Sequence, residues 1–186
     1  MSKNLQTFVL AGGCFWCLDA AYRALDGVES VVSGYTGGSV DAPSYELVCT
    51  GRTGHAEAVK VTFDADVIPA DTILDAYFTM HDPRQLDHQG ADTGTQYRSA
   101  MFFADDAQKA LFEAARDRAA DTWDAPIGRV EGTVVTTIEP AGTWWDAEDY
   151  HQDFFTKNPG QGYCLAVAVP KVNKVRAAFS QYVKVA

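Results

Sequence analysis

Hydrophobic and polar positions change their spacing along the chain in a way that predicts a succession of strands and helices. Residues 57–63 carry valine or phenylalanine at every second position, which is the period of a strand with one buried face. Residues 14–25 are predicted to form a helix that stops at the pair Asp26-Gly27. The other predicted strands are 8–11, 28–34, 97–103, 130–139 and 165–169, and the other predicted helices follow Pro69, follow Asp105, cover 146–157 and start at 171.

Because strands and helices mix along the whole length, the sequence predicts an α/β (α+β) fold. We expect a single domain over residues 1–186, with a central mixed β-sheet flanked by helices in a ferredoxin-like two-layer sandwich. No internal repeat or low-complexity linker divides the chain. The strand at 8–11 leads through two glycines into a helix, so residue 14 should lie at the carboxyl edge of the strand, where open α/β sheets place their sites.

Charge and composition narrow the class of partner. The chain has 25 acidic and 15 basic residues and a net charge of −10, which argues against nucleic acid or an anionic membrane surface. No apolar run approaches the roughly 20 residues of a membrane span, and the uncharged stretch 8–18 lacks the cleavage site of a signal peptide. We therefore expect a cytoplasmic protein whose four cysteines are catalytic or redox-active rather than a disulfide framework.

Two cysteines three positions apart open the first predicted helix. Cys14 follows the glycine pair, and Cys17 lies one helical turn further on. A helix N-terminus stabilises a thiolate, so we predict that Cys14 is a nucleophile rather than a buried apolar residue. Cys17 either closes a small disulfide ring with Cys14 or is an apolar helix residue. Cys49 and Cys164 are solitary, so no zinc site is expected.

Glu57 begins the most regular of the predicted strands. Alternation places it on the same face as Val59, Val61 and Phe63. If this is the core face, burial disfavours the charged carboxylate and raises its pKa, so that Glu57 holds a proton near neutral pH and acts as a general acid. The alternative is a strand-end glutamate that reaches solvent or pairs with a cation.

Two polar loops supply further candidates. Residues 90–97 are dense in hydrogen-bonding groups, including Asp92 and Tyr97, and Tyr45 lies in a second polar loop. Taken alone, each loop is typical of a turn. The histidines have no metal-ligand spacing with one another, so we expect no metal.

Taken together, the motifs resemble the methionine sulfoxide reductase A family over nearly the whole chain. The motifs are G-G-C-F-W-C at 12–17, G-Y-T-G-G at 34–38, S-Y-E-L-V-C-T-G at 44–51, G-H-A-E-A-V at 54–59, H-D-P at 81–83, G-T-Q-Y-R-S at 94–99, E-D-Y-H-Q-D at 148–153 and N-P-G-Q-G-Y-C at 158–164. The resemblance implies reduction of the S-epimer of methionine sulfoxide, free or in proteins. It also implies recycling by thioredoxin without a cofactor, and we expect a monomer.

The resemblance assigns a role to each matching residue of the site. A sulfoxide oxygen is a poor leaving group unless it is protonated, which suits a carboxylic acid of raised pKa beside an attacking thiol. The thiol becomes a sulfenic acid, which a second thiol converts to a disulfide. The implied roles are Cys14 as nucleophile, Glu57 as acid, Tyr45 and Tyr97 as donors to the sulfoxide oxygen, Asp92 as the group that orients the substrate, and Phe15 and Trp16 as walls of the S-methyl pocket.

The resolving thiol is open between Cys17 and Cys164. The family usually has glycine at position 17, whereas Cys164 matches the resolving cysteine of members with mobile C-terminal tails. Here a strand is predicted at 165–169 with a helix after it, so we expect the segment of Cys164 to be ordered rather than mobile. A disulfide with Cys14 needs the two Cα atoms to lie within about 7 Å of each other. We expect Cys17 to resolve first, with Cys164 second or as a relay, and Cys49 to be structural.

Two other functions compete with this hypothesis. A general thiol–disulfide oxidoreductase built on the Cys14/Cys17 pair would depend on Cys17 and be indifferent to Glu57. A module that only binds methionine sulfoxide or senses redox state would show no turnover with dithiothreitol and a sulfoxide substrate.

Overall fold

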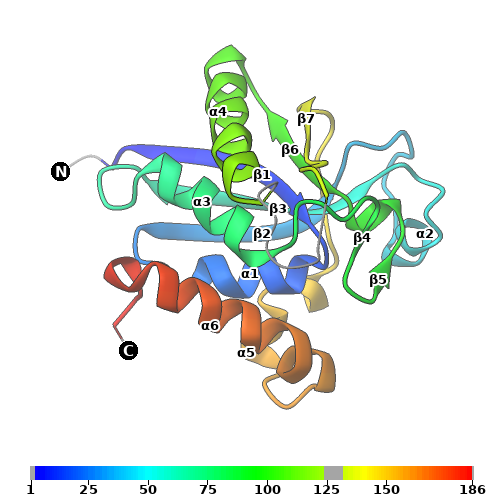
Figure 1. The fold of residues 1–186 in the computed structure, drawn as a ribbon. Helices are drawn as coiled ribbons and strands as arrows, with labels where there is room; N and C mark the ends of the chain where they lie inside the picture. Colours follow the sequence, from blue (N-terminus) through cyan, green and yellow to red (C-terminus); the bar gives the residue numbers. More distant parts are fainter. Residues whose placement is uncertain (1–2, 124–131, 186) are drawn as a thin grey trace.

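A computed structural model describes residues 3–123 and 132–185 (Figure 1). Its strands are β1 (Leu5–Gly12), β2 (Val28–Thr36), β3 (Ala56–Asp64), β4 (His88–Gln89), β5 (Asp92–Thr93), β6 (Ser99–Phe103), β7 (Thr137–Pro140) and β8 (Trp145–Asp146). Its α-helices are α1 (Phe15–Arg23), α2 (Tyr45–Cys49), α3 (Ala70–Met80), α4 (Asp106–Trp123), α5 (Phe154–Lys157) and α6 (Val169–Ala178). Short 3₁₀ turns are η1 (Thr95–Tyr97), η2 (Asp149–His151) and η4 (Ser180–Tyr182), and η3 (Cys164–Ala168) is π-helical.

The sheet contains a ferredoxin-like unit. The elements β1, α1, β2, β3, α3 and β6 follow one another, and the strands lie in the order β6-β1-β3-β2 with every neighbouring pair antiparallel. Strand β7 joins β6 in parallel after the crossover through α4, and β8 pairs with β2 at the other edge. The predicted fold, a central mixed sheet flanked by helices, is confirmed.

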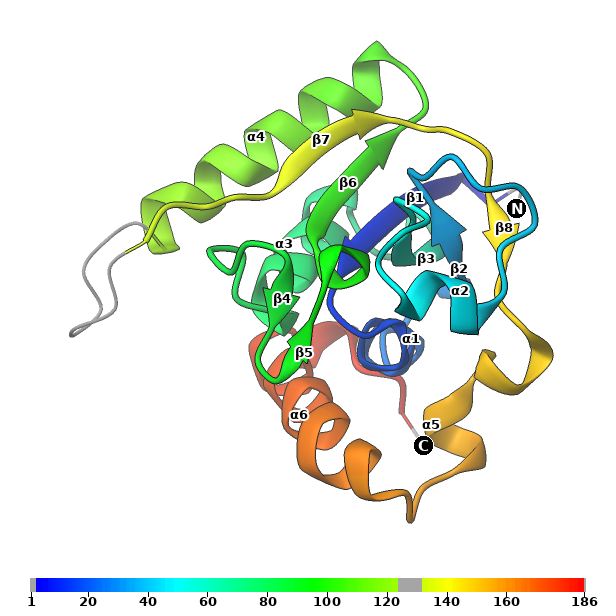
Figure 2. The ribbon, with the colours of Figure 1, turned by 90° about the vertical axis from the view of Figure 1, so that its right-hand side faces the viewer.

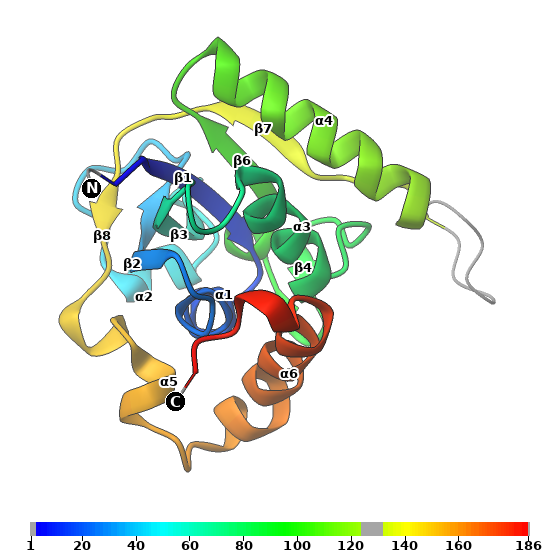
Figure 3. The same cartoon turned by 90° about the vertical axis from the view of Figure 1, so that its left-hand side faces the viewer.

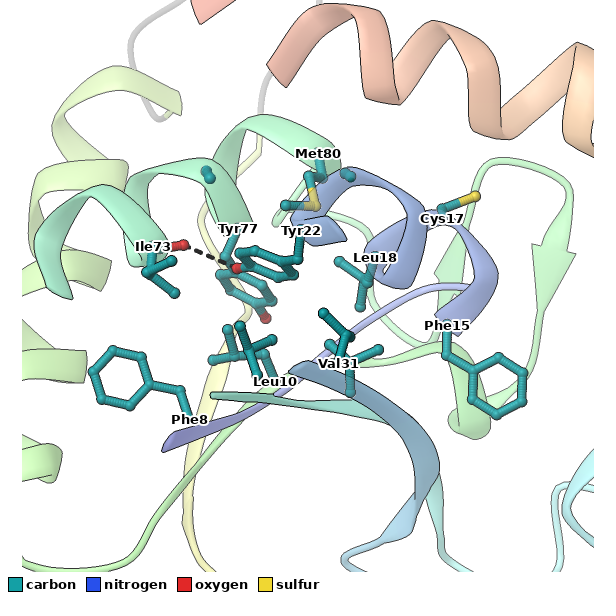
Figure 4. Close-up of a cluster of buried hydrophobic side chains, with 14 of the residues drawn as sticks. Phe8, Leu10, Phe15, Cys17, Leu18, Tyr22, Val31, Ile73, Tyr77 and Met80 are labelled. Atoms are coloured by element: carbon teal, nitrogen blue, oxygen red, sulfur yellow. Dashed lines mark hydrogen bonds between the residues drawn. The ribbon is translucent and has the colours of Figure 1, made fainter. Parts of the chain in front are cut away.

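The helices α1, α3, α4 and α6 gather on one face of the sheet (Figures 1 and 3). Leu10 and Val31 of the sheet meet Leu18 and Tyr22 of α1 in the core between these layers (Figure 4). The buried Tyr22 hydroxyl donates to the carbonyl oxygen of Ile73 in α3 at 2.9 Å, which satisfies a polar group that has no access to water.

The opposite face of the sheet buries mostly alanines, together with Phe102. Ala11, Ala58 and Ala100 are buried there, and Trp144 from the loop before β8 packs against them. Because side chains alternate along a strand, this arrangement places the valines of β3 on the helix-covered face. Glu57 has the same parity as Val59 and therefore points to the core beside α1.

The turn between β1 and α1 is fixed by two glycines. Gly13 has φ +90°, in the left-handed region that favours glycine, and a Cβ there would lie 2.8 Å from the Gln89 side chain. A Cβ on Gly12 would lie 3.2 Å from the ring of His81. Cys14 then has extended backbone and caps α1, so the two glycines allow the chain to reverse directly behind the cysteine.

The apolar run at 165–169 is helical, so the strand predicted there is wrong. Residues 164–168 form the π-helical η3, which continues into α6. Cys164 and Ala168 are buried whereas Leu165 is exposed, and this four-residue spacing is that of a helix face. A short apolar run does not distinguish a strand from a helix by its period.

The single helix predicted over 146–157 is also wrong, because this segment is divided into β8, η2 and α5. Asp153 has φ +52°, which interrupts a right-handed helix. The side chain of Gln152 accepts a hydrogen bond from Ser33 N–H at 2.9 Å and donates to Ser33 O and Ala147 O. These side-chain bonds attach the segment to β2 and replace bonds along a continuous helix.

Two predicted strands are shorter in the structure. Tyr97 ends the 3₁₀ turn η1, so β6 begins at Ser99 rather than at residue 97. In the prediction for 130–139, residues 130 and 131 lie outside the described part, residues 132–136 are irregular, and β7 covers Thr137–Pro140. The predicted helix after Asp105 is confirmed as α4, with Asp105 Oδ1 accepting from Gln108 N–H at 2.8 Å.

Candidate active site

The N-terminal end of α1 lies at the centre of a ring of short elements. Figure 2 views α1 end-on, with β4 and β5 on one side, α2 on the other, and α5 and the start of the α6 segment below. The predicted site residues come from α1 and its cap, from β3 and from this ring; they are Cys14, Phe15, Trp16, Cys17, Tyr45, Glu57, Asp92, Tyr97 and Cys164.

Cys14 is buried, with 8% of its surface exposed. Its side chain makes no capping hydrogen bond, and the N–H of Phe15 in the first turn donates to Glu57 Oε2 at 3.1 Å. Burial raises the pKa of the Cys14 thiol well above its usual range, and its hydrogen bond with Cys17 and the charge of Glu57 raise it further. The expected thiolate at Cys14 is therefore not favoured in the free protein, since an N–H group of the first turn binds Glu57 instead.

Cys17 is the more acidic of the two thiols. It is buried one turn along α1, and Figure 4 shows it leaving the helix in a different direction from Phe15. The hydrogen bond with Cys14 lowers the pKa of Cys17 to about 7 against the effect of burial, and the positive charge of Lys171 in α6 lowers it further. Cys17 therefore releases its proton at a lower pH than Cys14 does.

Glu57 is enclosed on the helix-covered face of β3, with 1% of its surface exposed. Burial raises the pKa of its carboxyl to about 8, the nearby charge of Asp92 adds to this effect, and the hydrogen bond from Phe15 N–H opposes it. The side chain is therefore mainly protonated at neutral pH and can donate a hydrogen bond toward the space beside Cys14.

Tyr45, predicted to lie in a loop, begins the short helix α2, and Tyr97 ends the turn η1. Both lie near the Glu57 carboxyl. Burial raises the pKa of both hydroxyls, and the charge of Glu57 acts on both in the same direction. The phenols therefore stay neutral hydrogen-bond donors throughout the physiological range. Asp92, in the short hairpin of β4 and β5, lies close enough to influence the pKa of both Glu57 and Tyr97.

The aromatic residues after Cys14 are held rigidly. The Trp16 ring stacks on Phe154 of α5 with centroids 3.7 Å apart and an interplanar angle of 4°. Its indole N–H donates to His151 Nδ1 at 3.0 Å, and the His151 ring also lies 5.0 Å from Phe15. Because indole can only donate, His151 Nδ1 must accept, so this buried imidazole is neutral.

Sequence reasoning gave no role to His151, Glu148 or Tyr163. Glu148 accepts hydrogen bonds at 2.8 Å from the Tyr45 N–H and from the Tyr35 hydroxyl, which fixes the start of α2 beside β2. The Tyr163 hydroxyl donates to Asp92 Oδ2 at 2.5 Å. These residues lie in the motifs at 148–153 and 158–164, which supported the family resemblance, but no local pattern indicates that they meet α1.

The two remaining cysteines differ in position. Cys164 is buried next to Tyr163, and burial followed by the charge of Cys17 raises its pKa. Cys49 is exposed at the end of α2. Burial is the main cause of the raised pKa of the Tyr45 hydroxyl, and the hydrogen bond between Tyr45 and Cys49 is the second. All four cysteines are free thiols in this structure.

Within residues 3–123 and 132–185, no group of three or more His, Cys, Asp and Glu side chains is arranged to hold a metal ion. Every helix in the described ranges is too short or too polar to span a bilayer.

The profile of a family described as peptide methionine sulfoxide reductase matches residues 6–183. The chain belongs to the peptide methionine sulfoxide reductase family. A relative in Clavibacter michiganensis, named peptide methionine sulfoxide reductase MsrA, is 71% identical over 182 residues, which cover 98% of this chain and 100% of the relative.

Solved structures of a yeast protein share the fold of this chain. Mxr1 from Saccharomyces cerevisiae in reduced form has a TM-score of 0.79 at 34% identity, over 87% of this chain and 90% of that chain. The same protein solved in complex with Trx2 has a TM-score of 0.56 at 23% identity, over 81% and 85% of the two chains. The family resemblance stated from the motifs is confirmed, and the fold with it.

Proposed function

We propose that this protein reduces the S-epimer of methionine sulfoxide, free or in proteins, with Cys14 as the nucleophile. The observation that supports this most strongly is the pairing of a thiol with a buried acid at the start of α1, where Phe15 N–H binds Glu57 directly behind Cys14. A carboxyl whose pKa is raised to about 8 carries a proton at neutral pH, which is what a sulfoxide oxygen requires.

In the first step, the Cys14 sulfur attacks the sulfoxide sulfur while Glu57 protonates the sulfoxide oxygen. The sulfur–oxygen bond of the substrate breaks, the oxygen ends on Cys14 as a sulfenic acid, and methionine leaves as a thioether. The substrate sulfur gains two electrons and the Cys14 sulfur loses two. The thiol proton of Cys14 returns to Glu57, so the acid is restored.

Tyr45 and Tyr97 donate hydrogen bonds to the sulfoxide oxygen as charge develops on it, and Asp92 orients the substrate. Both hydroxyls stay neutral and lie near enough to Glu57 for its charge to raise their pKa, which supports this assignment. Phe15 and Trp16 receive the S-methyl group. The stacking of Trp16 on Phe154 supports a rigid apolar pocket, which selects methyl over a polar substituent.

In the second step, Cys17 resolves the sulfenic acid of Cys14, because its thiol is one helical turn away and has a pKa of about 7. Cys164 acts second or as a relay. Thioredoxin then reduces the disulfide by thiol–disulfide exchange, as the family resemblance implies. We assign the protein to the cytoplasm, where reduced thiols and a dithiol reductant are available. We also propose that it acts as a monomer and needs no cofactor.

Rapid-quench single turnover with an S-sulfoxide peptide and no reductant tests the proposal. Cys14→Ser should abolish methionine formation, and Glu57→Gln should slow it by about 100-fold, a typical effect of losing a general acid. Glu113→Gln on the outer helix α4 is the matched control and should behave as wild type. Methionine formation by Glu57→Gln at the wild-type rate would refute the role of Glu57.

A general thiol–disulfide oxidoreductase is the second candidate, favoured by the hydrogen-bonded thiol pair of Cys14 and Cys17. It predicts faster reduction of a disulfide peptide than of the sulfoxide peptide, loss of this activity in Cys17→Ser, and no loss in Glu57→Gln. Wild type, Cys17→Ser and Glu57→Gln, each assayed on both peptides, distinguish the two functions.

A further inference from the structure

Tyr163 reaches the thiol pair from the segment between α5 and η3. Its hydroxyl donates to Asp92 Oδ2 at 2.5 Å and lies 3.9 Å from the Cys17 sulfur. Its ring packs edge-on against Trp16, with centroids 5.8 Å apart, so that the hydroxyl is held in place. One oxygen atom therefore joins a carboxylate on the β4–β5 hairpin to a thiol on α1.

The chemistry of Cys17, Tyr163 and Asp92 gives this series of hydrogen bonds a direction. A phenol has a single proton, and the Tyr163 hydroxyl donates it to a carboxylate oxygen of Asp92. While Tyr163 donates its proton to Asp92, its oxygen can only accept, so a protonated Cys17 is the donor in the contact between the two residues. The hydrogen bonds run from Cys17 through Tyr163 to Asp92.

We propose that Tyr163 is a proton relay that activates Cys17 for the resolving step. This inference rests on the proposed function, because it needs a sulfenic acid on Cys14. It assigns Asp92 a second task after the substrate has left, as the base at the far end of the relay. The relay also explains why a thiol enclosed in apolar surroundings can act as a nucleophile.

The step balances as follows. The Cys17 proton moves to the Tyr163 oxygen while the Tyr163 proton moves to Asp92, and the Cys17 thiolate attacks the Cys14 sulfur. The bond between Cys14 sulfur and its oxygen breaks, the disulfide forms, and the leaving hydroxide takes the proton from Asp92 through the same relay to become water. The Cys14 sulfur gains one electron on going from the sulfenic acid to the disulfide, and the Cys17 sulfur loses one. No external oxidant or reductant is therefore needed for this step.

Cys164 is adjacent to Tyr163 in sequence but takes no part in the relay. Its backbone N–H donates to Gln161 Oε1 at 3.0 Å, and no hydrogen bond of its sulfur to Tyr163 or Asp92 exists among the described residues. The relay therefore favours Cys17 over Cys164 as the first partner of Cys14. The ionisable groups that act on the Cys17 thiol are Cys14, Lys171, Tyr163, Asp92, Glu57 and Cys164.

The test separates the two steps in one single-turnover experiment. Methionine formation reports the first step, and acid quench followed by mass spectrometry reports the Cys14–Cys17 disulfide. In Tyr163→Phe, the ratio of disulfide rate to methionine rate should fall at least tenfold. Sulfenic acid should accumulate and be trapped by dimedone, and the pH profile of the disulfide step should move to higher pH. Tyr150→Phe, an exposed tyrosine of η2, is the control and should keep the wild-type ratio.

The amplitude of the methionine burst measures the folded, active fraction of each variant, so misfolding is not mistaken for a lost relay. A full burst with an unchanged ratio in Tyr163→Phe overturns the inference, whereas absence of a burst in the wild-type protein overturns the proposed function. In a Cys17→Ser background, Tyr163→Phe should not slow the loss of sulfenic acid further. An additional slowing there would also count against a relay through Cys17.

Discussion

The buried carboxyl of Glu57 makes a prediction about folding that does not depend on turnover. Its pKa is about 8 in the folded protein against an ordinary value of 4.5, so between these two pH values the folded state holds a proton that the unfolded state has released. Stability then falls as pH rises, by about 1.4 kcal/mol per pH unit. Over this interval the loss is about 5 kcal/mol, the product of this slope and the difference between the two pKa values.

Glu57→Gln removes the titration and keeps an oxygen that accepts from Phe15 N–H. Below pH 4.5 the free energy of unfolding of the wild-type protein should equal or exceed that of the variant. The difference should decrease steadily up to pH 8, and at pH 9 the wild-type protein should be the less stable of the two. Urea unfolding of the reduced proteins at pH 5, 7 and 9 measures the difference in free energy at each pH.

The comparison isolates Glu57 because all other titrating groups are common to both proteins. Glu113→Gln is again the control, since this side chain is half-exposed on α4 and, among the described residues, forms an ion pair only with Lys109, at 3.9 Å. Parallel stability curves for wild type and Glu57→Gln from pH 5 to pH 9 would mean that Glu57 ionises in the folded protein as it does in water. The reasoning from burial to a protonated acid would then fail.

Three further changes test how the site is held. Gly13→Ala forces a side chain into φ +90° and against Gln89, so we expect a loss of about 1–3 kcal/mol in stability and of turnover, whereas Gly142→Ala, with open space around its Cβ, should change neither. Arg23→Met leaves the buried Asp19 without the guanidinium that binds both of its oxygens. Because burial already raises the pKa of Asp19 to about 6, urea unfolding should show a loss of about 3 kcal/mol at pH 8 and a smaller loss at pH 5, and an equal loss at both would contradict the role of the Asp19 charge. Tyr77→Phe removes a buried hydroxyl that donates to Ala11 O at 2.8 Å and contacts Ser99 Oγ at 2.9 Å, which should cost about 1–3 kcal/mol in thermal or urea unfolding, and an unaltered midpoint would show that these bonds contribute nothing net.

The sequence alone determined the local chemistry. The alternation at residues 57–63 fixed both the strand and the face that Glu57 shares with Val59, because the period of a strand leaves no other arrangement. The glycine pair placed Cys14 at the start of a helix, since only such a turn reverses the chain between β1 and α1. The order of elements predicted the mixed sheet, because consecutive strands and helices pack in few ways.

Tertiary structure decided what local patterns leave open. The apolar run 165–169 is consistent with either period, and packing of Ala168 on the core made it helical. The segment 146–157 is broken because Gln152 binds the backbone of Ser33, a partner more than a hundred residues away in sequence. Long-range contacts of this kind outweigh local propensity whenever they satisfy buried backbone groups.

The same distinction holds for the two cysteines at the start of α1. Their spacing indicated a thiol pair, but it did not tell which sulfur is the more acidic. Cys17 has a pKa of about 7 because Cys14 binds it and Lys171 lies near it, while burial raises the pKa of Cys14. Tyr163 and Asp92 meet Cys17 only in the folded chain. The sequence provides the reactive groups, and the fold sets their proton affinities, because these depend on burial and on charges brought from distant segments.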